Sequence, residues 1–539
     1  MTDTTADNYR RRTAPPTEAG QNPPPGPRPR NVSGPTAGLR GRPVGSGSGR
    51  VTEVVIVGAG FGGLTMAAEL RSAGIDEFLV LESGADVGGV WRENTYPGCA
   101  CDVPSHLYSF EFAPYRDAAI RFPGQAEILD YMRQVVERHG LRAHLRCGTA
   151  VTGADFDSAT GMWTLTTAAG QRIRARTVVW AVGQLHRPAY PVFPGAHTFS
   201  GRAFHSARWN HDADLTGHIA VIGTGSSAVQ IVPELARTAA SVTVYQRTPA
   251  WILPKPRQRF GPVSRWLLGH VPGAHQLYRA GVSHGADAVL APIMRGGWSA
   301  RPATWIARAH LRRQVPDPVL RDALTPRYRI GEKRILLSSS YYPALMRPTV
   351  EVVTDTIDRI TADGICTADG THRRADVIVY ATGFRASDLL GGVRIRGCGG
   401  MDLHDRWIAG RPEAFLGLAV PGFPNMFLIA GPHSFTPANS NPSLKADQAR
   451  YIAACIALAD RWGTPIEVAT TAMSAYRVWL DAQLARTVWP TGVPSWFKRA
   501  DGEVTNAWPA TARAFHRMTS TDPARAFRPM PDQDSAGPV

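Results

Sequence analysis

Hydrophobic positions near the start of the ordered sequence predict a strand, a helix and a second strand. Glu53–Val57 is a short apolar run, and a glycine-rich loop and a stretch with helical apolar spacing to Ala73 follow it. A second apolar run, Phe78–Glu82, comes directly after. This order of elements is that of a βαβ unit.

The same pattern recurs further along the chain. A strand is predicted at His218–Ile222, a helix through Ala236 and another strand at Val242–Tyr245, again with a glycine loop between the first strand and the helix. Two further apolar runs, Val178–Gly183 and Val377–Gly383, resemble each other. We expect these two runs to mark the places where the chain crosses between two domains.

We therefore expect an α/β protein with two Rossmann-like dinucleotide-binding domains, the first split in sequence and the second inserted within it. The expected divisions are a disordered tail at 1–50, a first domain from 51–190 and 375–520, an inserted domain at 191–374 and a C-terminal tail at 521–539. The tail at 1–50 holds nine Pro and eight Gly but little apolar material that could bury surface.

Two stretches need separate interpretation. A helical insertion is expected near 252–330, with one helix at Pro302–Val315, and it is either a determinant of substrate specificity or a packing appendage. Ala414–Pro432 is apolar enough to suggest a membrane span, but Pro421, Gly422 and Pro424 interrupt it. We expect two buried strands around a turn there.

Charge and cysteine content narrow the function classes. The net charge is +15, but residues 1–50 alone carry eight Arg against three acids, and only four of the 59 basic residues are Lys. No run of five or six like charges is present, so we expect no nucleic-acid partner and anionic cofactors instead. The six Cys form no CxxC pair and no secretory signal precedes them, so a cytoplasmic protein without a metal site or a membrane partner is expected.

The first glycine loop, GAGFGG, matches the G-x-G-x-x-G pattern at Gly58, Gly60 and Gly63. Glycines in this pattern allow a tight turn and the close approach of a pyrophosphate to a helix N-terminus. Glu82 ends the second strand, where a carboxylate can accept hydrogen bonds from both ribose hydroxyls and repels a 2′-phosphate. The first unit is therefore expected to bind FAD or NAD.

The second loop, GTGSSA, begins at Gly223, and the position equivalent to Glu82 holds Arg247, flanked by Gln246 and Thr248. A guanidinium is suited to a 2′-phosphate, which predicts NADPH. Two dinucleotide sites suit hydride transfer from NADPH to FAD. Since there is no redox CxxC, molecular oxygen is the natural acceptor of the electrons.

From Val51 to Pro509 the sequence resembles the type I Baeyer–Villiger monooxygenases. Phe199–Trp209 fits the family fingerprint FxGxxxHxxxW, with Asn210 in place of the Pro or Asp that usually follows, and Gly88–Asp102 fits GGxWxxxxYPGxxxD in full. The resemblance implies insertion of one oxygen atom of O2 next to a ketone carbonyl, through a flavin C4a-peroxide, to give an ester or lactone. It is consistent with a role in tailoring natural products.

The resemblance also implies residue roles. Arg334 is expected to stabilise the negative charge of the reaction, Asp102 to orient Arg334, and Lys333 to supplement Arg247 at the NADPH phosphate. His205, within the fingerprint, is interpreted as a hydrogen-bonded anchor rather than a proton carrier. The remaining expected contacts are, for FAD, Val90, Trp91, Asp102, Tyr108 and Val151, and for NADP, Thr224, Gly225, Ser226, Ser227 and Trp496.

Two other functions stay open from the sequence. One is an N- or S-oxygenase of the sister group, which typically has Tyr where Trp209 stands here. The other is a flavin-binding redox sensor without catalysis. The expected partners are a small ketone and O2, with a monomer or a weak homo-oligomer, and the identity of the ketone is not encoded in the motifs.

Overall fold

The structure is a computed structural model, and it describes residues 51–115, 119–257 and 259–530. The tail expected at 1–50 and the last nine residues lie outside the described residues. In the part of the chain that the structure describes, no helix is both long and apolar enough to cross a membrane.

The first domain is built on a sheet of eight strands in the order β17-β4-β5-β6-β1-β2-β3, with β18 also paired to β6. Residues 145–180 and the later segment 394–428 thus contribute neighbouring strands of one sheet. The strands are β1 (Val51–Val57), β2 (Phe78–Leu81), β3 (Leu145–Arg146), β4 (Val151–Asp157), β5 (Met162–Thr167), β6 (Arg172–Trp180), β17 (Arg394–Arg396) and β18 (Met426–Leu428).

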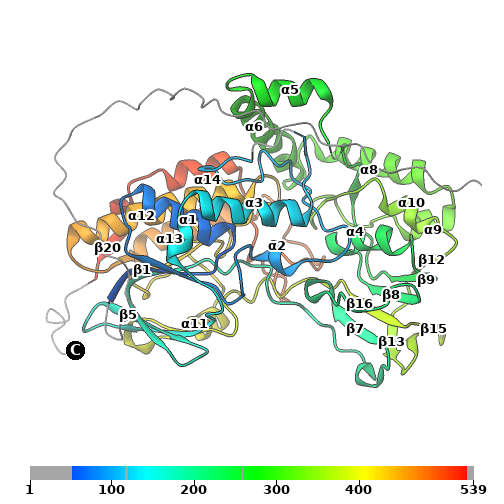
Figure 1. Cartoon of the computed structure of the whole chain (residues 1–539), viewed down its shortest axis with the longest axis horizontal. Coiled ribbons are helices and arrows are strands. Elements are labelled where there is room, and N and C mark those ends of the chain that lie inside the picture. The colour runs from blue at the N-terminus through cyan, green and yellow to red at the C-terminus, as the bar shows by residue number, and fades with distance from the viewer. Residues whose placement is uncertain (1–50, 116–118, 258, 531–539) are drawn as a thin grey trace, which may run out of the picture. The chain divides into compact units, whose positions relative to one another are not determined.

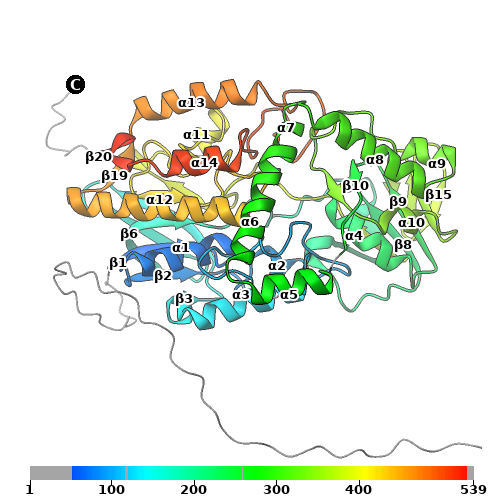
Figure 2. The same ribbon diagram turned by 90° about the horizontal axis from the view of Figure 1, so that it is seen from above.

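Helices cover both faces of this sheet. One core joins it to α1 (Phe61–Ser72), α3 (Gln125–Arg138) and α12 (Asn441–Trp462), and α12 lies between α1 and α14 (Ala512–Thr519) in Figure 2. A second core on the other face includes α11 (Leu403–Ala409). The helix α13 (Thr470–Leu484) and the pair of strands β19 (Ile466–Val468) and β20 (Phe527–Pro529) complete the domain.

The second domain has a parallel sheet of five strands in the order β12-β9-β8-β16-β7. Its core is formed by alternate apolar residues of the strands, which pack against the helices α4 (Ser226–Leu235) and α10 (Tyr341–Leu345). The strands are β7 (Arg202–His205), β8 (His218–Ile222), β9 (Ser241–Tyr245), β12 (Val350–Val353) and β16 (Val377–Tyr380), and a small sheet adds β13 (Ile357–Ile360), β14 (Gly364–Thr367) and β15 (His372–Arg374). Figure 1 shows these elements in green and yellow.

The insertion is helical, as expected. It contains α5 (Pro262–His270), α6 (Ala274–Gly285), α7 (Ala291–Ile293), α8 (Ala300–Gln314) and α9 (Pro318–Ala323), and it is bracketed by the paired strands β10 (Ile252–Leu253) and β11 (Leu336–Leu337). The remaining short elements include α2 (Val90–Glu93) and a one-turn 3-10 helix at Ser206–Arg208.

Three expected boundaries differ from the structure. The strand β16 belongs to the second sheet, because it pairs in parallel with both β7 and β8, so that domain extends past 374. The chain also packs beyond 520: Phe527 is buried and β20 pairs with β19. Finally, Ala414–Pro432 contains one strand, β18, and isolated bridges rather than two strands, since two turns shorten the extended segments.

The two apolar runs that resemble each other form the end of β6 in the first sheet and β16 in the second, and each is followed by a glycine with positive φ, Gly183 and Gly383. The two crossing segments are adjacent, because the Ala189 amide donates to the Gly383 carbonyl at 2.9 Å. The Ala207 amide donates to Nδ1 of His205, so Nε2 carries the proton and donates to the same carbonyl of Gly383 at 2.9 Å. Burial lowers the pKa of His205. This geometry supports the anchor interpretation of His205.

Candidate functional site

A cavity of about 1880 Å³ extends along the carboxyl ends of the parallel strands of both sheets. Ligand pockets are commonly 300–1,000 Å³, so this volume is large enough for more than one ligand. Of the expected site residues, all but Gly63 line it: Gly58, Gly60, Glu82, Val90, Trp91, Asp102, Tyr108, Val151, Gly223, Thr224, Gly225, Ser226, Ser227, Gln246, Arg247, Thr248, Lys333, Arg334 and Trp496.

The first glycine loop is shaped by close backbone contacts. Gly58 has φ +106°, and a Cβ there would lie 2.6 Å from the carbonyl oxygen of Ala181. Gly63 does not line the cavity; a Cβ on it would lie 1.8 Å from the carbonyl oxygen of Gly58. The residue is therefore needed for the packing of α1 against β1, which leaves the α1 N-terminus open to a phosphate.

Glu82 is buried at the end of β2, and its Oε2 accepts a hydrogen bond from the Ala59 amide at 2.8 Å. Its Oε1 accepts from the Gly84 amide at 2.7 Å and forms an ion pair with Arg92 at 2.9 Å. The ion pair with Arg92 was not predicted from the sequence, because a motif does not indicate which cation will pair with a carboxylate at the end of a strand. The carboxylate is held rigidly beside the first loop, as an FAD ribose requires.

The second loop repeats the geometry of the first. Gly223 has φ +113°, and a Cβ there would lie 2.5 Å from the carbonyl oxygen of Ala381. Around Gly225 a Cβ would meet no atom within 4 Å, so space is available in front of the α4 N-terminus. Thr224 donates its hydroxyl to the carbonyl of Thr248 at 2.8 Å and ties the loop to the segment that follows β9.

The end of the second unit is cationic. Arg247 is exposed, and the charge of Arg247 adds to burial in lowering the pKa of Lys333. Lys333 lies over the ring of Tyr328, with Nζ 5.1 Å from the centroid, and forms no ion pair with a described carboxylate. Two neighbouring cations without a paired acid favour an anionic ligand such as a 2′-phosphate.

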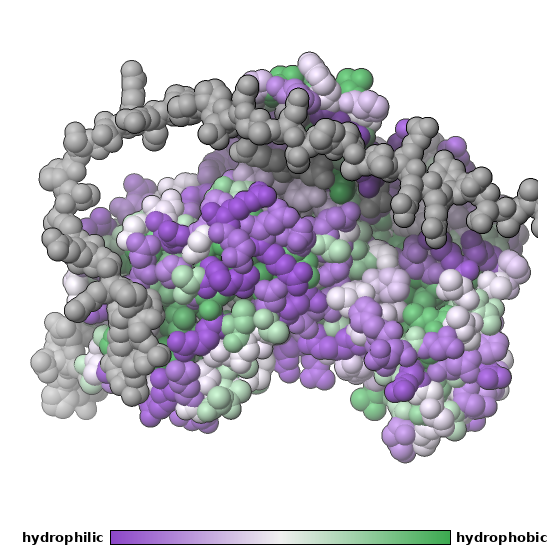
Figure 3. All heavy atoms as spheres, viewed as in Figure 1, coloured by the Kyte–Doolittle hydropathy of each residue, from purple (hydrophilic) through white to green (hydrophobic). Residues whose placement is uncertain are grey.

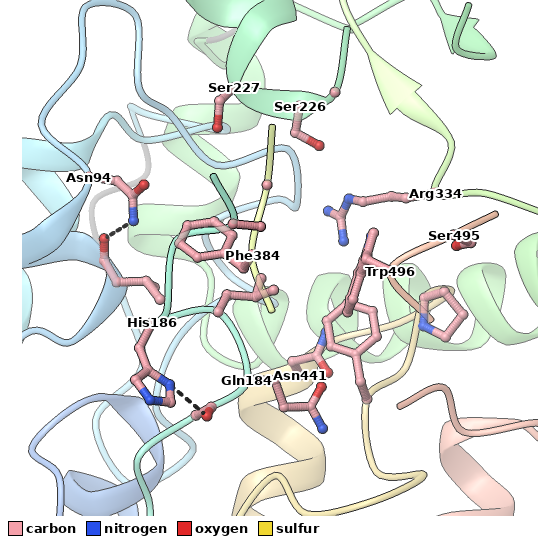
Figure 4. Close-up of a pocket in the computed structure, with 18 of the residues that line it drawn as sticks. Asn94, Gln184, His186, Ser226, Ser227, Arg334, Phe384, Asn441, Ser495 and Trp496 are labelled. Atoms are coloured by element: carbon pink, nitrogen blue, oxygen red, sulfur yellow. Dashed lines mark hydrogen bonds between the residues drawn. The ribbon is translucent and has the colours of Figure 1, made fainter. Parts of the chain in front are cut away.

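Arg334 and Asp102, which are 232 positions apart, form an ion pair inside the cavity. Nη2 of Arg334 donates to both carboxylate oxygens of Asp102, at 2.7 Å each, and attraction to Asp102 raises the pKa of the guanidinium. In Figure 4 Arg334 reaches into the cavity between Ser226 of α4 and Trp496. The pair thus lies between the two nucleotide loops, with one face of the guanidinium free to act on a ligand.

Aromatic side chains shape the first domain's part of the cavity. Trp91 donates its indole N–H to the hydroxyl of Tyr108 at 3.1 Å, and Tyr108 packs edge-on against Phe61 with centroids 5.1 Å apart. Burial raises the pKa of the Tyr108 hydroxyl, which stays protonated as a neutral donor. These rings provide an apolar lining to the cavity beside the first glycine loop.

Trp496 belongs to a loop that packs on the segment before Arg334. The indole N–H of Trp489 donates to the carbonyl of Gly331 at 3.0 Å, and Asn506 donates its side-chain amide to the carbonyl of Trp496 at 2.7 Å. Nζ of the buried Lys498 donates to the carbonyls of Thr491 and Val493, at 2.7 and 2.9 Å. These contacts position Trp496 at the cavity, and none of them follows from a motif.

Several cavity residues were missed by sequence reasoning because they come from loops and helices without a recognisable pattern. The set is Arg92, Asn94, Gln184, His186, Phe384, Phe435, Asn441 and Lys445. Lys445 is noteworthy, since no hydrogen bond or ion pair joins it to another described residue and burial lowers its pKa to about 8. The sequence gives no signal that this lysine, in the second turn of α12, faces a cavity.

Known proteins resemble this chain in sequence and in structure. A family model for pyridine nucleotide-disulphide oxidoreductases matches residues 55–268. A Baeyer-Villiger monooxygenase of Streptomyces coelicolor is 39% identical over 495 residues, 90% of this chain and 94% of that protein. One from Pseudomonas aeruginosa is 38% identical over 482 residues, 89% of this chain and 91% of that protein.

Solved structures are similar over the same length. The crystal structure of cyclohexanone monooxygenase from Rhodococcus sp. Phi1 bound to NADP+ gives a TM-score of 0.79 at 28% identity. The match covers 89% of this chain and 99% of that one.

Proposed function

Because the chain belongs to the Baeyer–Villiger monooxygenases, we propose that its Arg334–Asp102 pair is the catalytic centre at which a ketone is converted to an ester or lactone. The protein is an FAD- and NADPH-dependent monooxygenase that takes one oxygen atom from O2. When bound, FAD reduced by NADPH supplies the activated oxygen. The observation that supports the assignment is a permanent cation, fixed by a carboxylate, between two nucleotide-binding loops.

Arg334 holds the ketone for attack and stabilises the oxyanion that develops on the substrate carbonyl. A guanidinium is suited to this task because it does not lose its proton near neutral pH. Asp102 fixes the plane of Arg334 and keeps its charge in place before the reaction, so little reorganisation is needed during it. One nitrogen of Arg334 is used by Asp102, and the others are available to the substrate.

The two cofactors are assigned to the two loops. FAD is held by the first loop, with Glu82 on its ribose and Trp91 and Tyr108 beside its ring system. NADPH is held by the second loop, with Arg247 and Lys333 at its 2′-phosphate and Trp496 at its nicotinamide side.

The insertion contributes to substrate specificity, because three of its apolar residues line the cavity: Val282, Ala286 and Leu290.

The experiment is to replace Arg334 with Ala and to follow ester or lactone formation from a panel of ketones with NADPH. Loss of a preorganised partner for an oxyanion lowers turnover roughly 100- to 1,000-fold, and Arg334→Lys should not restore it because an ammonium lacks the planar donor geometry. FAD content should be unchanged. Arg327→Ala, an exposed arginine of the same segment, is the control.

Near-normal lactone formation by Arg334→Ala would show that the residue is a bystander. If the unaltered enzyme oxygenates an amine or sulfide and no ketone, the function is that of the N- and S-oxygenating sister group. NADPH consumption that no substrate stimulates would instead indicate a redox sensor.

A further inference from the structure

The hairpin formed by α5 and α6 is unusual in how little of it is packed. No residue from Gly261 to Leu290 is buried, and this range includes all nine residues of α5. A helix of this length is marginal in water without a packing partner. Figure 1 shows α5 at the upper edge of the ribbon, with α6 behind it.

Large apolar side chains cover the outer surface of this hairpin. Val263, Trp266 and Leu267 on α5, Val271 in the turn and Leu277 on α6 are 72, 58, 43, 38 and 76% exposed. Single exposed apolar residues are ordinary, but five large ones within fifteen positions form a patch that indicates an interaction site. Figure 3 shows hydrophobic surface at the position of α5.

The segment that carries this patch is basic. From residue 235 to residue 286 the chain has no Asp or Glu but seven Lys or Arg. Arg257, Arg259 and Arg265 are exposed, and none of the three forms an ion pair with another residue that the structure describes. Cations that no described carboxylate pairs with, beside exposed Trp and Leu, are typical of surfaces that bind anionic lipids.

The inner side of α6 faces the site. Arg279 fixes the helix to the first domain, since it donates to the carbonyl of His106 and forms an ion pair with Glu111, each at 3.2 Å. Val282 and Ala286 line the cavity while Leu277, further back on the same helix, is exposed. The helix therefore separates the apolar outer patch from the substrate cavity.

We propose that the α5–α6 hairpin docks the enzyme on the surface of an anionic lipid bilayer. Trp266 and Leu267 insert at the level of the headgroups, and Arg257, Arg259 and Arg265 pair with lipid phosphates. The helix α5 is only about 14 Å long, less than half the thickness of a bilayer core, so the hairpin lies in the interface rather than across it. Docking places the α6 wall of the cavity beside lipid that can dissolve apolar ketones.

A lipid surface fits better than a second copy of the chain. Two copies that met through this patch would bring the same exposed arginines together, and like charges repel. An anionic bilayer compensates the arginines and accepts the apolar residues at the same time. This inference goes beyond the proposed function, since docking does not depend on which substrate is oxidised.

The test is sedimentation of the FAD-loaded enzyme with vesicles of phosphatidylglycerol and phosphatidylcholine, compared with pure phosphatidylcholine, at low and high salt. Each cation near an anionic surface contributes about five-fold to partitioning, so loss of three lowers it roughly 100-fold. The enzyme should bind only the anionic vesicles, and high salt should weaken this binding. Binding should fall at least ten-fold in Trp266→Ser/Leu267→Ser and in Arg257→Glu/Arg265→Glu.

The matched control is Ile408→Ser/Val478→Ser, because both residues are 72% exposed but lie on α11 and α13, away from the hairpin. It should bind vesicles like the unaltered enzyme, and all variants should retain FAD and turn over a water-soluble ketone. Absence of binding, or equal binding by the hairpin variants, would overturn the proposal. So would a dimer in sedimentation velocity that the Trp266/Leu267 variant dissociates, or capture of the hairpin by an acidic protein with none by the vesicles.

Discussion

At the scale of single residues, the choice between the two nicotinamide cofactors depends on the cation at the end of β9. In the proposed assignment, Arg247 makes a charge-assisted contact with the 2′-phosphate, a group that NADH lacks. Replacing Arg247 with Ala should raise the KM for NADPH about ten-fold or more and leave the KM for NADH nearly unchanged. Steady-state kinetics with both cofactors measure this, and Arg237→Ala, an exposed arginine after α4, is the control. Equal use of the two cofactors by the unaltered enzyme would contradict the assignment.

A second residue prediction concerns Lys445, whose pKa burial lowers to about 8. The unfolded chain keeps this lysine protonated up to about pH 10.4, so between the two values the unfolded state binds more protons and stability rises with pH. Lys445→Met removes the cost of burying the charge. The variant should melt at a higher temperature at pH 7, and its advantage should shrink as the pH rises from 8 to 10. An advantage that does not change with pH would show that the charge is not the cause.

At the scale of elements, the loop that carries Trp496 is fastened by Lys498. The ammonium is buried and bonded to two loop carbonyls, which are left without a donor in Lys498→Met. The cost is about 1.5–3 kcal/mol, and the loop should loosen locally. We expect faster proteolysis between 489 and 499, a higher KM for NADPH and unchanged FAD content. Arg486→Met, which removes an exposed charge just before the loop, should change none of these.

The sequence predicted the elements whose function is fixed by spacing. Glu82 and Arg247 could be assigned because a βαβ unit places the end of its second strand beside its glycine loop, whatever the rest of the fold. The contacts of Arg92 and Lys498 could not be predicted, since they depend on the path of loops that carry no motif. The strand β16 was assigned to the wrong domain because a buried apolar run does not indicate which of two sheets it joins.

At the scale of the whole molecule, the first domain's loop before Asp102 contacts α4 of the second domain. Gln230 donates to the carbonyl of Ala100 at 2.9 Å and accepts from the Tyr96 hydroxyl at 3.1 Å. Gly98 has φ +78°, and a Cβ there would lie 2.7 Å from the carbonyl oxygen of Gln230. Gly98→Ala should therefore displace α4 from this loop.

The expected result for Gly98→Ala is a higher KM for NADPH and lower turnover, with FAD still bound. Gly148→Ala is the control, because Gly148 also has a positive φ, +65°, but a Cβ there meets no atom within 4 Å. Both variants carry the same backbone strain, and only one carries the clash. Equal loss of activity in the two would show that strain alone, and not contact between the domains, is responsible.

The split of the first domain also sets the order in which the protein acquires structure during synthesis. The strands β17 and β18 and the helix α12 are translated long after β4, β6 and α1, against which they pack. The ribosome must add 282 residues between Trp180 and Trp462, which takes roughly 15 to 55 s at 5–20 residues per second. The last strand of the second sheet ends at Tyr380, so the inserted domain can fold before β18 and α12 have been synthesised. During this time the apolar faces of β1 and α1 are not yet covered. Nascent chains that stall in this interval expose those faces, and they are the ones that chaperones should retain.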